Sequence, residues 1–240
     1  FDSRLPRAAD EKCLALLGFF TRRSQKRAAT RQGLRVIMLI VRKAAAFITR
    51  ETSNEREILV FRHPFAGIQL PAGTVEEGES FAEGALREAH EETGLTDLSI
   101  VAHLGVLEKV YEGQQRRMIA DTYAVTQPSG ILTNDFFERG IPILVGETRD
   151  GYTYVTHDVS RDAYYPTPGI SGWVPANTVA VHRIERHLFH LQSASQPPDQ
   201  WQHIAEGQYN FSFYWVAVNA HPELEGEQQA WWDAVIEKLR

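Results

Sequence analysis

Apolar runs separated by polar turn residues predict a chain with more β-strands than helices. The predicted strands span residues 36–49, 58–62, 67–73, 98–110, 117–126, 184–192 and 211–218. Gly105 is expected to form a bulge in the fourth of these strands. Helical patterns are confined to a short segment at residues 10–20, the stretch after Ser80, and residues 226–240 at the end.

The middle of the chain holds further short apolar runs that the other strands do not account for. Residues 141–155 read as two strands around an Asp150-Gly151 turn, and residues 169–175 read as a third strand that ends at a proline. We therefore predict an inserted, β-rich module over residues 126–179. An ordinary long hairpin or a lid loop of the surrounding domain would give a similar pattern.

The helix after Ser80 has well-defined ends in the sequence. Ser80 and Glu83 stand at the spacing of a capping box, in which each residue satisfies a backbone N–H of the other. Gly94 suits the left-handed position just past the end of the helix. The spacing thus predicts a helix of about a dozen residues.

Three carboxylates share one face of this helix, because Glu88, Glu91 and Glu92 stand at positions i, i+3 and i+4. The helix offers Arg87 as its one arginine or lysine to balance them. A hard divalent cation such as Mg²⁺ would account for the cluster, since it binds carboxylates and shares its other positions with phosphates. A charged surface helix is the alternative explanation for these residues alone.

The stretch from Gly73 to Leu95 resembles the signature of the Nudix hydrolases. All seven fixed positions of that signature are filled, by Gly73, Glu79, Arg87, Glu88, Glu91, Glu92 and Gly94. The resemblance implies an α+β fold of the Nudix type, an α/β/α sandwich around a mixed β-sheet, here carrying an all-β insertion. On this basis we assign residues 36–125 and 180–240 to the Nudix domain.

The resemblance also implies roles for the residues of the signature. Glu88, Glu91, Glu92 and the backbone carbonyl of Gly73 are the expected ligands of Mg²⁺ or Mn²⁺. Glu91 and Glu92 are also the expected catalytic carboxylates. The same resemblance implies that Glu79 and Arg87 form an ion pair that supports the helix and the loop before it, a role suited to the planar arginine fork.

Residues outside the signature are further candidates for the site. Glu227 lies in a Glu-x-Gln-Ala-aromatic segment that resembles one found before the last helix of some diadenosine-polyphosphate hydrolases of the family, which makes it a second candidate for base or metal ligand. It is equally consistent with a glutamate placed at a helix N-terminus. Tyr111, Lys43 and Arg62 are candidates for contacts with the base and the phosphates of a substrate.

The inserted region has a resemblance of its own. Over residues 130–178 a strand, an Asp-Gly-Tyr turn and a Gly-Trp-Val-Pro strand follow one another in an order similar to that of bacterial SH3-like small barrels. Such a module can close over the active site, bind a partner or mediate a homodimer. We expect it to lie near the active site and to contribute to substrate specificity.

Charge and cysteine content restrict the cellular setting. The 240 residues carry a formal net charge of −6, yet residues 1–43 hold 11 Lys and Arg against 3 acidic residues. Residues 1–35 are predicted to be a basic, poorly ordered arm, and Met38 is the expected start of the natural protein. A single cysteine, Cys13, excludes a disulfide within the chain and favours a reducing cytoplasm. We expect neither a membrane span nor a specific nucleic-acid partner.

Three functions are compatible with a Nudix signature. The first is a metal-dependent pyrophosphohydrolase acting on a small nucleotide derivative, such as a nucleotide sugar or a dinucleoside polyphosphate. The second is a non-catalytic sensor that binds a nucleotide, a reading that the complete set of carboxylates disfavours. The third, an isopentenyl diphosphate isomerase, is set aside because Cys13 precedes the first core strand.

Overall fold

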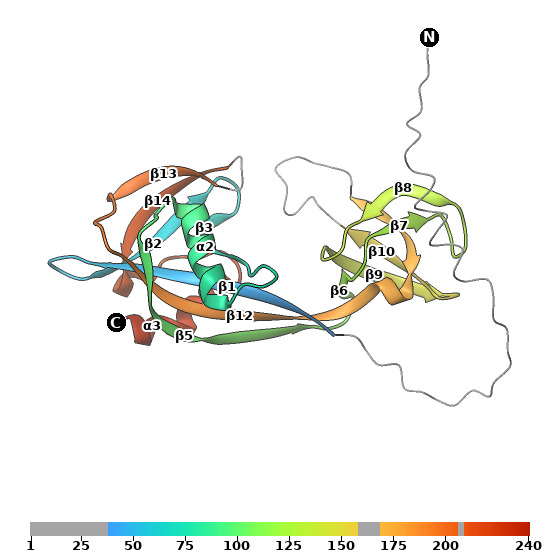
Figure 1. Cartoon of the computed structure of the whole chain (residues 1–240), viewed down its shortest axis with the longest axis horizontal. Coiled ribbons are helices and arrows are strands. Elements are labelled where there is room, and N and C mark those ends of the chain that lie inside the picture. The colour runs from blue at the N-terminus through green and yellow to red at the C-terminus, as the bar shows by residue number, and fades with distance from the viewer. Residues whose placement is uncertain (1–37, 158–168, 206–208) are drawn as a thin grey trace, which may run out of the picture. The chain divides into compact units, whose positions relative to one another are not determined.

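The main β-sheet is built around two long strands, β1 (Met38–Glu51) and β12 (Val179–Ser193), which pair in parallel (Figure 1). The structure, a computed structural model, describes residues 38–157, 169–205 and 209–240. The other pairings in this sheet are antiparallel, so the sheet is mixed. Its remaining strands are β2 (Arg56–His63), β3 (Gly67–Gln69), β4 (Ala72–Thr74), β5 (Leu98–Tyr111), β13 (Gln200–Ala205) and β14 (Tyr209–Ala217).

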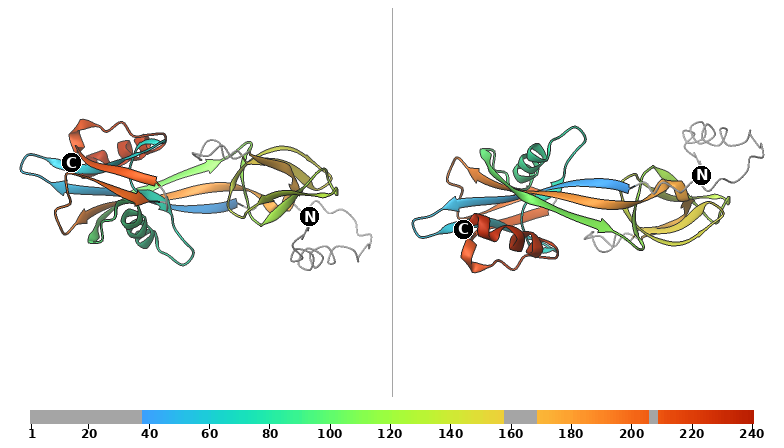
Figure 2. Two further views of the ribbon diagram at one scale, coloured as in Figure 1. Left: turned by 90° about the horizontal axis from the view of Figure 1, so that it is seen from above. Right: turned by 90° about the horizontal axis from the view of Figure 1, so that it is seen from below.

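One helix covers each face of the main sheet (Figure 2). Side chains of β1 alternate between the faces, so Ala44 and Ala46 pack with α2 (Phe81–Thr93), whereas Ala45 and Phe47 pack with α3 (Gln228–Leu239). Burial on both faces explains why this strand reads as a continuous apolar run. The two layers of helix around a mixed sheet confirm the predicted α+β, α/β/α Nudix-type fold.

Several predicted elements are found with small changes. Both helices form where the sequence placed them, and the register of β5 against β12 shifts at Gly105, which confirms the bulge. The single strand predicted over residues 117–126 is wrong, because the chain breaks there into β6 (Gln115–Met118) and β7 (Thr122–Val125). Strand β13 was not anticipated; its exposed, polar-rich sequence carries little apolar signal.

A second sheet is attached to the main one through β12. The start of β12 pairs with β6, and the order then continues through β9, β10, β11, β7 and β8. The added strands are β8 (Leu132–Phe137), β9 (Pro142–Arg149), β10 (Tyr152–His157) and β11 (Ile170–Pro175). Short 3-10 helices follow β11 at Ala176–Thr178 and β14 at Val218–Ala220. Strand β12 thus belongs to both sheets.

The second sheet has a hydrophobic cluster of its own. Met118, Phe137 and Val155 are fully buried in it. The predicted Asp150-Gly151 turn joins β9 to β10, with both residues at positive φ, as a tight two-residue hairpin requires. Strand β6 pairs with β12 and strand β7 pairs with β11, so both belong to this sheet although they precede residue 126, the predicted start of the insertion. The division into domains and the likeness to an SH3-like barrel stay predictions.

The N-terminal predictions concern residues that the structure does not describe. The basic arm of residues 1–35, the short helix at 10–20 and Cys13 all lie outside the described residues. Within the described part of the chain, no helix is long and apolar enough to cross a membrane.

Candidate active site

The helix that carries the carboxylates is fixed at both ends by the predicted residues. Ser80 accepts a hydrogen bond from the backbone N–H of Glu83, and the Glu83 carboxylate accepts one from the N–H of Ser80, which completes the capping box. Gly94 ends α2 in the left-handed conformation, at φ 75°. The helix therefore begins and ends where the sequence placed it, and its acidic face is fixed relative to the loop before it.

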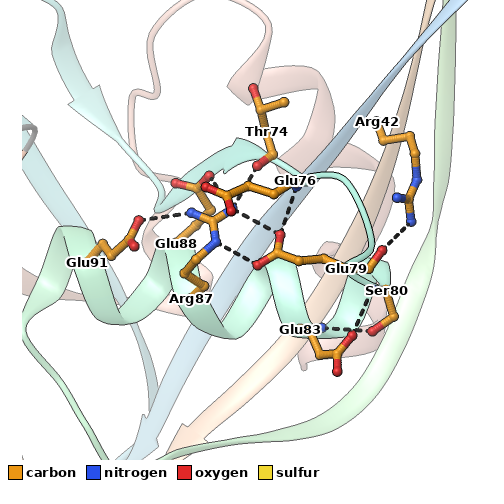
Figure 3. Close-up of polar contacts among 9 residues, drawn as sticks. All are labelled: Arg42, Thr74, Glu76, Glu79, Ser80, Glu83, Arg87, Glu88 and Glu91. Carbon is orange, nitrogen blue, oxygen red and sulfur yellow. Dashed lines mark hydrogen bonds and ion pairs between the residues drawn. The ribbon is translucent and has the colours of Figure 1, made fainter.

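Arg87 is the centre of the polar network on this face (Figure 3). Its guanidinium donates to both carboxylate oxygens of Glu79, at 2.7 and 3.2 Å, and to the backbone oxygen of Thr74 at 2.8 Å. It also pairs with Glu88 at 3.1 Å and Glu91 at 2.9 Å. The hydrogen bonds from Arg87 lower the pKa of the Glu79 carboxyl. The expected ion pair is present, and it ties the loop to the helix.

Glu88 lies directly against the backbone of Gly73. A Cβ atom at position 73 would stand only 2.0 Å from the carboxyl carbon of Glu88, so a larger residue there would displace the Glu88 carboxylate. Burial raises the pKa of Glu88, although the neighbouring Arg87 acts in the opposite direction. This carboxylate is thus held in a place where its charge is only partly compensated.

The other two carboxylates differ in their surroundings. Glu92 is 8% exposed and accepts a hydrogen bond from the backbone N–H of Ala72 at 3.0 Å. Glu91 has a side chain that is 59% exposed and reaches back to Arg87. Of the three predicted ligands, Glu88 and Glu92 therefore face the β4 backbone, whereas Glu91 stands at the outer rim.

These residues line a common cavity of about 420 Å³, which we call the carboxylate cavity. Its walls are Lys43, Ala72, Gly73, Thr74, Glu76, Arg87, Glu88, Glu91 and Glu92. Among the described residues, no three acidic, histidine or cysteine side chains are already gathered around one point as a metal site. The donor set nevertheless suits a hard divalent cation: carboxylate oxygens beside a glycine backbone that leaves no space for a Cβ, with one carboxylate incompletely neutralised.

Cations line the sheet beside this cavity. Lys43 donates to the Thr74 hydroxyl at 2.5 Å, and burial together with the charges of Arg186 and Arg117 lowers its pKa to about 8. Arg186 on β12 stands opposite Lys43 on β1 in the strand register. It is 9% exposed, and its guanidinium carbon lies 3.7 Å from the centre of the Trp231 ring. Burial lowers the pKa of Arg186 to about 10.

Arg186 and Glu76 are site residues that sequence reasoning missed. A signal for Arg186 was available, because it falls on the same side of its strand as the apolar Ile184 and Leu188. A charge on the apolar side of a strand indicates a buried partner or a ligand. Glu76 offered no comparable signal, since it occupies a variable position of the signature loop.

Glu227 lies in a different cavity, of about 320 Å³, together with Lys109, Arg186 and Trp231. Its carboxylate pairs with the Lys109 ammonium and accepts a longer bond, at 3.4 Å, from the Tyr111 hydroxyl. It makes no side-chain capping bond to α3. Arg186 lines the same cavity as Glu227 and stands opposite Lys43 in the strand register. Glu227 itself is not among the described residues that line the carboxylate cavity.

Two further predicted residues, Tyr111 and Arg62, are not among the described residues that line the carboxylate cavity. The Tyr111 ring already stacks on His182, with ring centres 4.4 Å apart, and it has the Lys109 ammonium 4.8 Å from its centre. Arg62 is exposed on β2, opposite Ser212 of β14. The roles assigned to these residues stay predictions.

One family model matches part of the chain. Residues 40–139 match the family model described as the NUDIX domain, a span that includes the whole signature and the strands around it. This match supports a Nudix pyrophosphohydrolase. No curated protein matches the sequence.

Solved structures that match the chain include an Ap4A hydrolase of C. elegans, which is 14% identical over 83% of this chain and 97% of its own, with a TM-score of 0.39. A UDP-X diphosphatase is also 14% identical, over 95% of this chain and 71% of its own, with a TM-score of 0.35. NrtR of Shewanella oneidensis is 13% identical over 83% of this chain and 63% of its own, with a TM-score of 0.31.

Proposed function

We propose that the protein hydrolyses a pyrophosphate bond in a nucleoside diphosphate linked to another group, with Mg²⁺ or Mn²⁺ bound in the carboxylate cavity. One observation carries this proposal: the Glu88 carboxylate is held against Gly73, beside the nearly buried Glu92, in a cavity that also contains cationic side chains. This combination suits a cation and a phosphate together better than it suits either alone.

The residues of the cavity divide the work by their chemistry. Glu88, Glu92 and the carbonyl of Gly73 would hold the cation, with Glu91 at the rim. The chemistry supplied there is Lewis-acid stabilisation of phosphate charge and activation of water. Lys43 in the cavity and Arg186 beside it attract and orient the phosphates by their positive charge.

Arg87 acts on the reaction indirectly. It clamps Glu79 and the Thr74 carbonyl, and so fixes the distance between the helix and the Gly73 loop. A lysine at this position would keep the charge but lose the forked hydrogen bonds. The general base remains open between Glu91, Glu92 and Glu227.

The cellular setting follows from the sequence alone. A reducing cytoplasm is proposed because the chain has a single cysteine, and a small nucleotide derivative is the proposed partner. A homodimer is compatible with these proposals, and analytical ultracentrifugation of the purified chain tests it.

A substrate panel tests the proposal. Nucleotide sugars, ADP-ribose, NADH, dinucleoside polyphosphates and nucleoside triphosphates are incubated with Mg²⁺ or Mn²⁺, and phosphate-containing products are measured. We expect turnover of at least one member, lost on chelation, and a fall in kcat on the order of 10³-fold in Glu92→Gln, since a metal site supplies several kcal/mol. Glu237→Gln, an exposed change on α3, serves as the matched control and keeps full activity.

The same panel decides between enzyme and sensor. Nucleotide binding without metal-dependent turnover of any member would overturn the hydrolase proposal and favour a non-catalytic sensor. Equal activity of Glu92→Gln and Glu237→Gln would instead show that the carboxylate cavity is not where hydrolysis takes place.

A further inference from the structure

A second cavity, which we call the cationic pocket, lies where β5 and β12 meet the second sheet. It measures about 360 Å³ and is lined by Tyr111, Gln115, Arg116, Arg117, Pro142, Ile143, Leu144, His157, His182 and Ile184. The lining contains two arginines and two histidines, and none of these described residues is acidic. Positive charge in this pocket therefore has no carboxylate of the lining to balance it.

Two buried polar atoms of this pocket lack a partner. Neither Nδ1 of His182 nor Nε of Arg117 has a hydrogen-bond partner among the described residues. His182 is only 3% exposed, and its ring is fixed by stacking on Tyr111. Leaving buried polar groups unpaired costs free energy, so such groups in a native structure indicate a missing ligand or bridging water.

The electrostatics of the pocket agree with this geometry. Burial and the charges of Arg117 and Arg116 lower the pKa of His182 to about 4. Burial also lowers the pKa of Arg117, whose guanidinium bonds to the Gly140 carbonyl and to no carboxylate of the residues that the structure describes. Arginine is the residue best suited to bind phosphate oxygens in a partly desolvated place.

A groove of about 730 Å³ shares wall residues with both the cationic pocket and the carboxylate cavity. It shares Arg117 and Pro142 with the cationic pocket, and it shares Thr74 and Glu76 with the carboxylate cavity. Arg117 lies on β6 and Pro142 on β9, both of which are labelled in Figure 1. One extended ligand can therefore contact both ends.

We propose that the cationic pocket binds a phosphate-bearing distal end of the substrate, while the pyrophosphate to be cleaved lies at the carboxylate cavity. The proposal rests on the hydrolase function proposed above and adds a substrate class to it, namely substrates with more phosphate than the cleaved pair alone. In this arrangement the second sheet, through Arg116 and Arg117 of β6, selects the length and charge of the substrate.

The test compares a short and a long substrate of the same nucleoside. Diadenosine diphosphate holds only the bond to be cleaved, whereas diadenosine tetraphosphate carries additional phosphates that reach along the groove. Arg117→Gln should raise KM for the tetraphosphate roughly 10-fold or more, the usual size of a lost charge-assisted contact, and leave KM for the diphosphate unchanged. Arg149→Gln, the same change on β9 away from the pocket, should affect neither substrate.

A second variant covers the case in which Arg117→Gln disturbs folding, as judged by its thermal unfolding. Arg116→Gln removes the less buried cation and should raise KM for the tetraphosphate in the same direction. Direct binding is measured separately by calorimetry with inorganic tripolyphosphate in the presence of EDTA. Wild type should bind it at least roughly 10-fold more tightly than Arg117→Gln.

The outcomes separate this inference from the proposed function. Equal effects of Arg117→Gln on both substrates, or equal tripolyphosphate affinity, would overturn the pocket while leaving the hydrolase intact. Arginine-dependent binding of tripolyphosphate with an unchanged KM for the tetraphosphate would mean that the pocket takes a separate anion, which also overturns the proposal. Absence of turnover on every substrate would count against the function itself, and the calorimetry would still decide the pocket.

Discussion

The carboxylate cavity and the cationic pocket hold opposite charges and are built in opposite ways. Three of the four carboxylates of the first come from one helix, α2, and the fourth, Glu76, comes from the loop just before that helix. The second brings together β5, β6, β9, β10 and β12, whose residues are up to about seventy positions apart. Chemistry built from local spacing can be recognised in a sequence, whereas a pocket built from strand pairing cannot.

The two regions also have separate hydrophobic clusters, and this separation can be tested through Phe137, which is fully buried in the second sheet. Phe137→Ala should lower the free energy of unfolding of that sheet by about 3–5 kcal/mol. Hydrogen exchange should show lost protection in β6 to β11 and retained protection in α2. Equal loss of protection in both regions would mean that they unfold as one cooperative unit.

The pH dependence of stability tests the buried state of His182. Its pKa is about 4 in the folded protein, below its usual 6.5, so the unfolded chain binds the proton first as the pH falls. Stability contributed by the neutral ring is complete above pH 6.5 and is lost on acidification from 6.5 to 4, by up to about 3 kcal/mol.

Urea unfolding at pH 7.5 and pH 4.5 measures this loss. His182→Phe should lose less stability than wild type between the two pH values, because its ring does not titrate. The exposed His90→Gln is the control and should follow wild type. A wild-type loss matched by His182→Phe would show that His182 is not the group responsible.

The smallest expected change concerns the fit between Gly73 and Glu88. Gly73→Ala places a methyl group where the Glu88 carboxylate lies, and should lower kcat about 10- to 100-fold, the range seen when groups that orient metal ligands are altered. Gly146→Ala in β9 is the control, because its added Cβ would meet neighbours at an ordinary 3.7 Å. If both variants keep full activity, the contact between Gly73 and Glu88 is not needed for catalysis.

Local rules predicted one part of the molecule well. The helix α2, its capping box and the left-handed Gly94 all follow from spacings of fewer than fifteen residues, and the Glu79–Arg87 pair was implied by the resemblance to the Nudix signature. The Asp150-Gly151 turn was predictable for the same reason, since few residues adopt positive φ at both turn positions.

Other parts depended on pairings that a single sequence does not reveal. β8 was missed because its Leu-Thr-Asn-Asp-Phe-Phe sequence has little alternation, and it forms only by pairing with β7. The place of Arg117 beside His182 depends on the pairing of β6 with β12, across more than sixty residues. Register at that distance is determined by the packing of both sheets.

The proposed function depends most on the carboxylate cavity binding a divalent cation, and Mn²⁺ binding measures this without any substrate. Mn²⁺ is titrated into wild type, Glu88→Gln, Glu92→Gln and the control Glu237→Gln, with free Mn²⁺ followed by electron paramagnetic resonance. We predict saturable binding in wild type and Glu237→Gln that is weakened at least about 10-fold in the two cavity variants. Equal Mn²⁺ affinity in all four proteins would contradict the account.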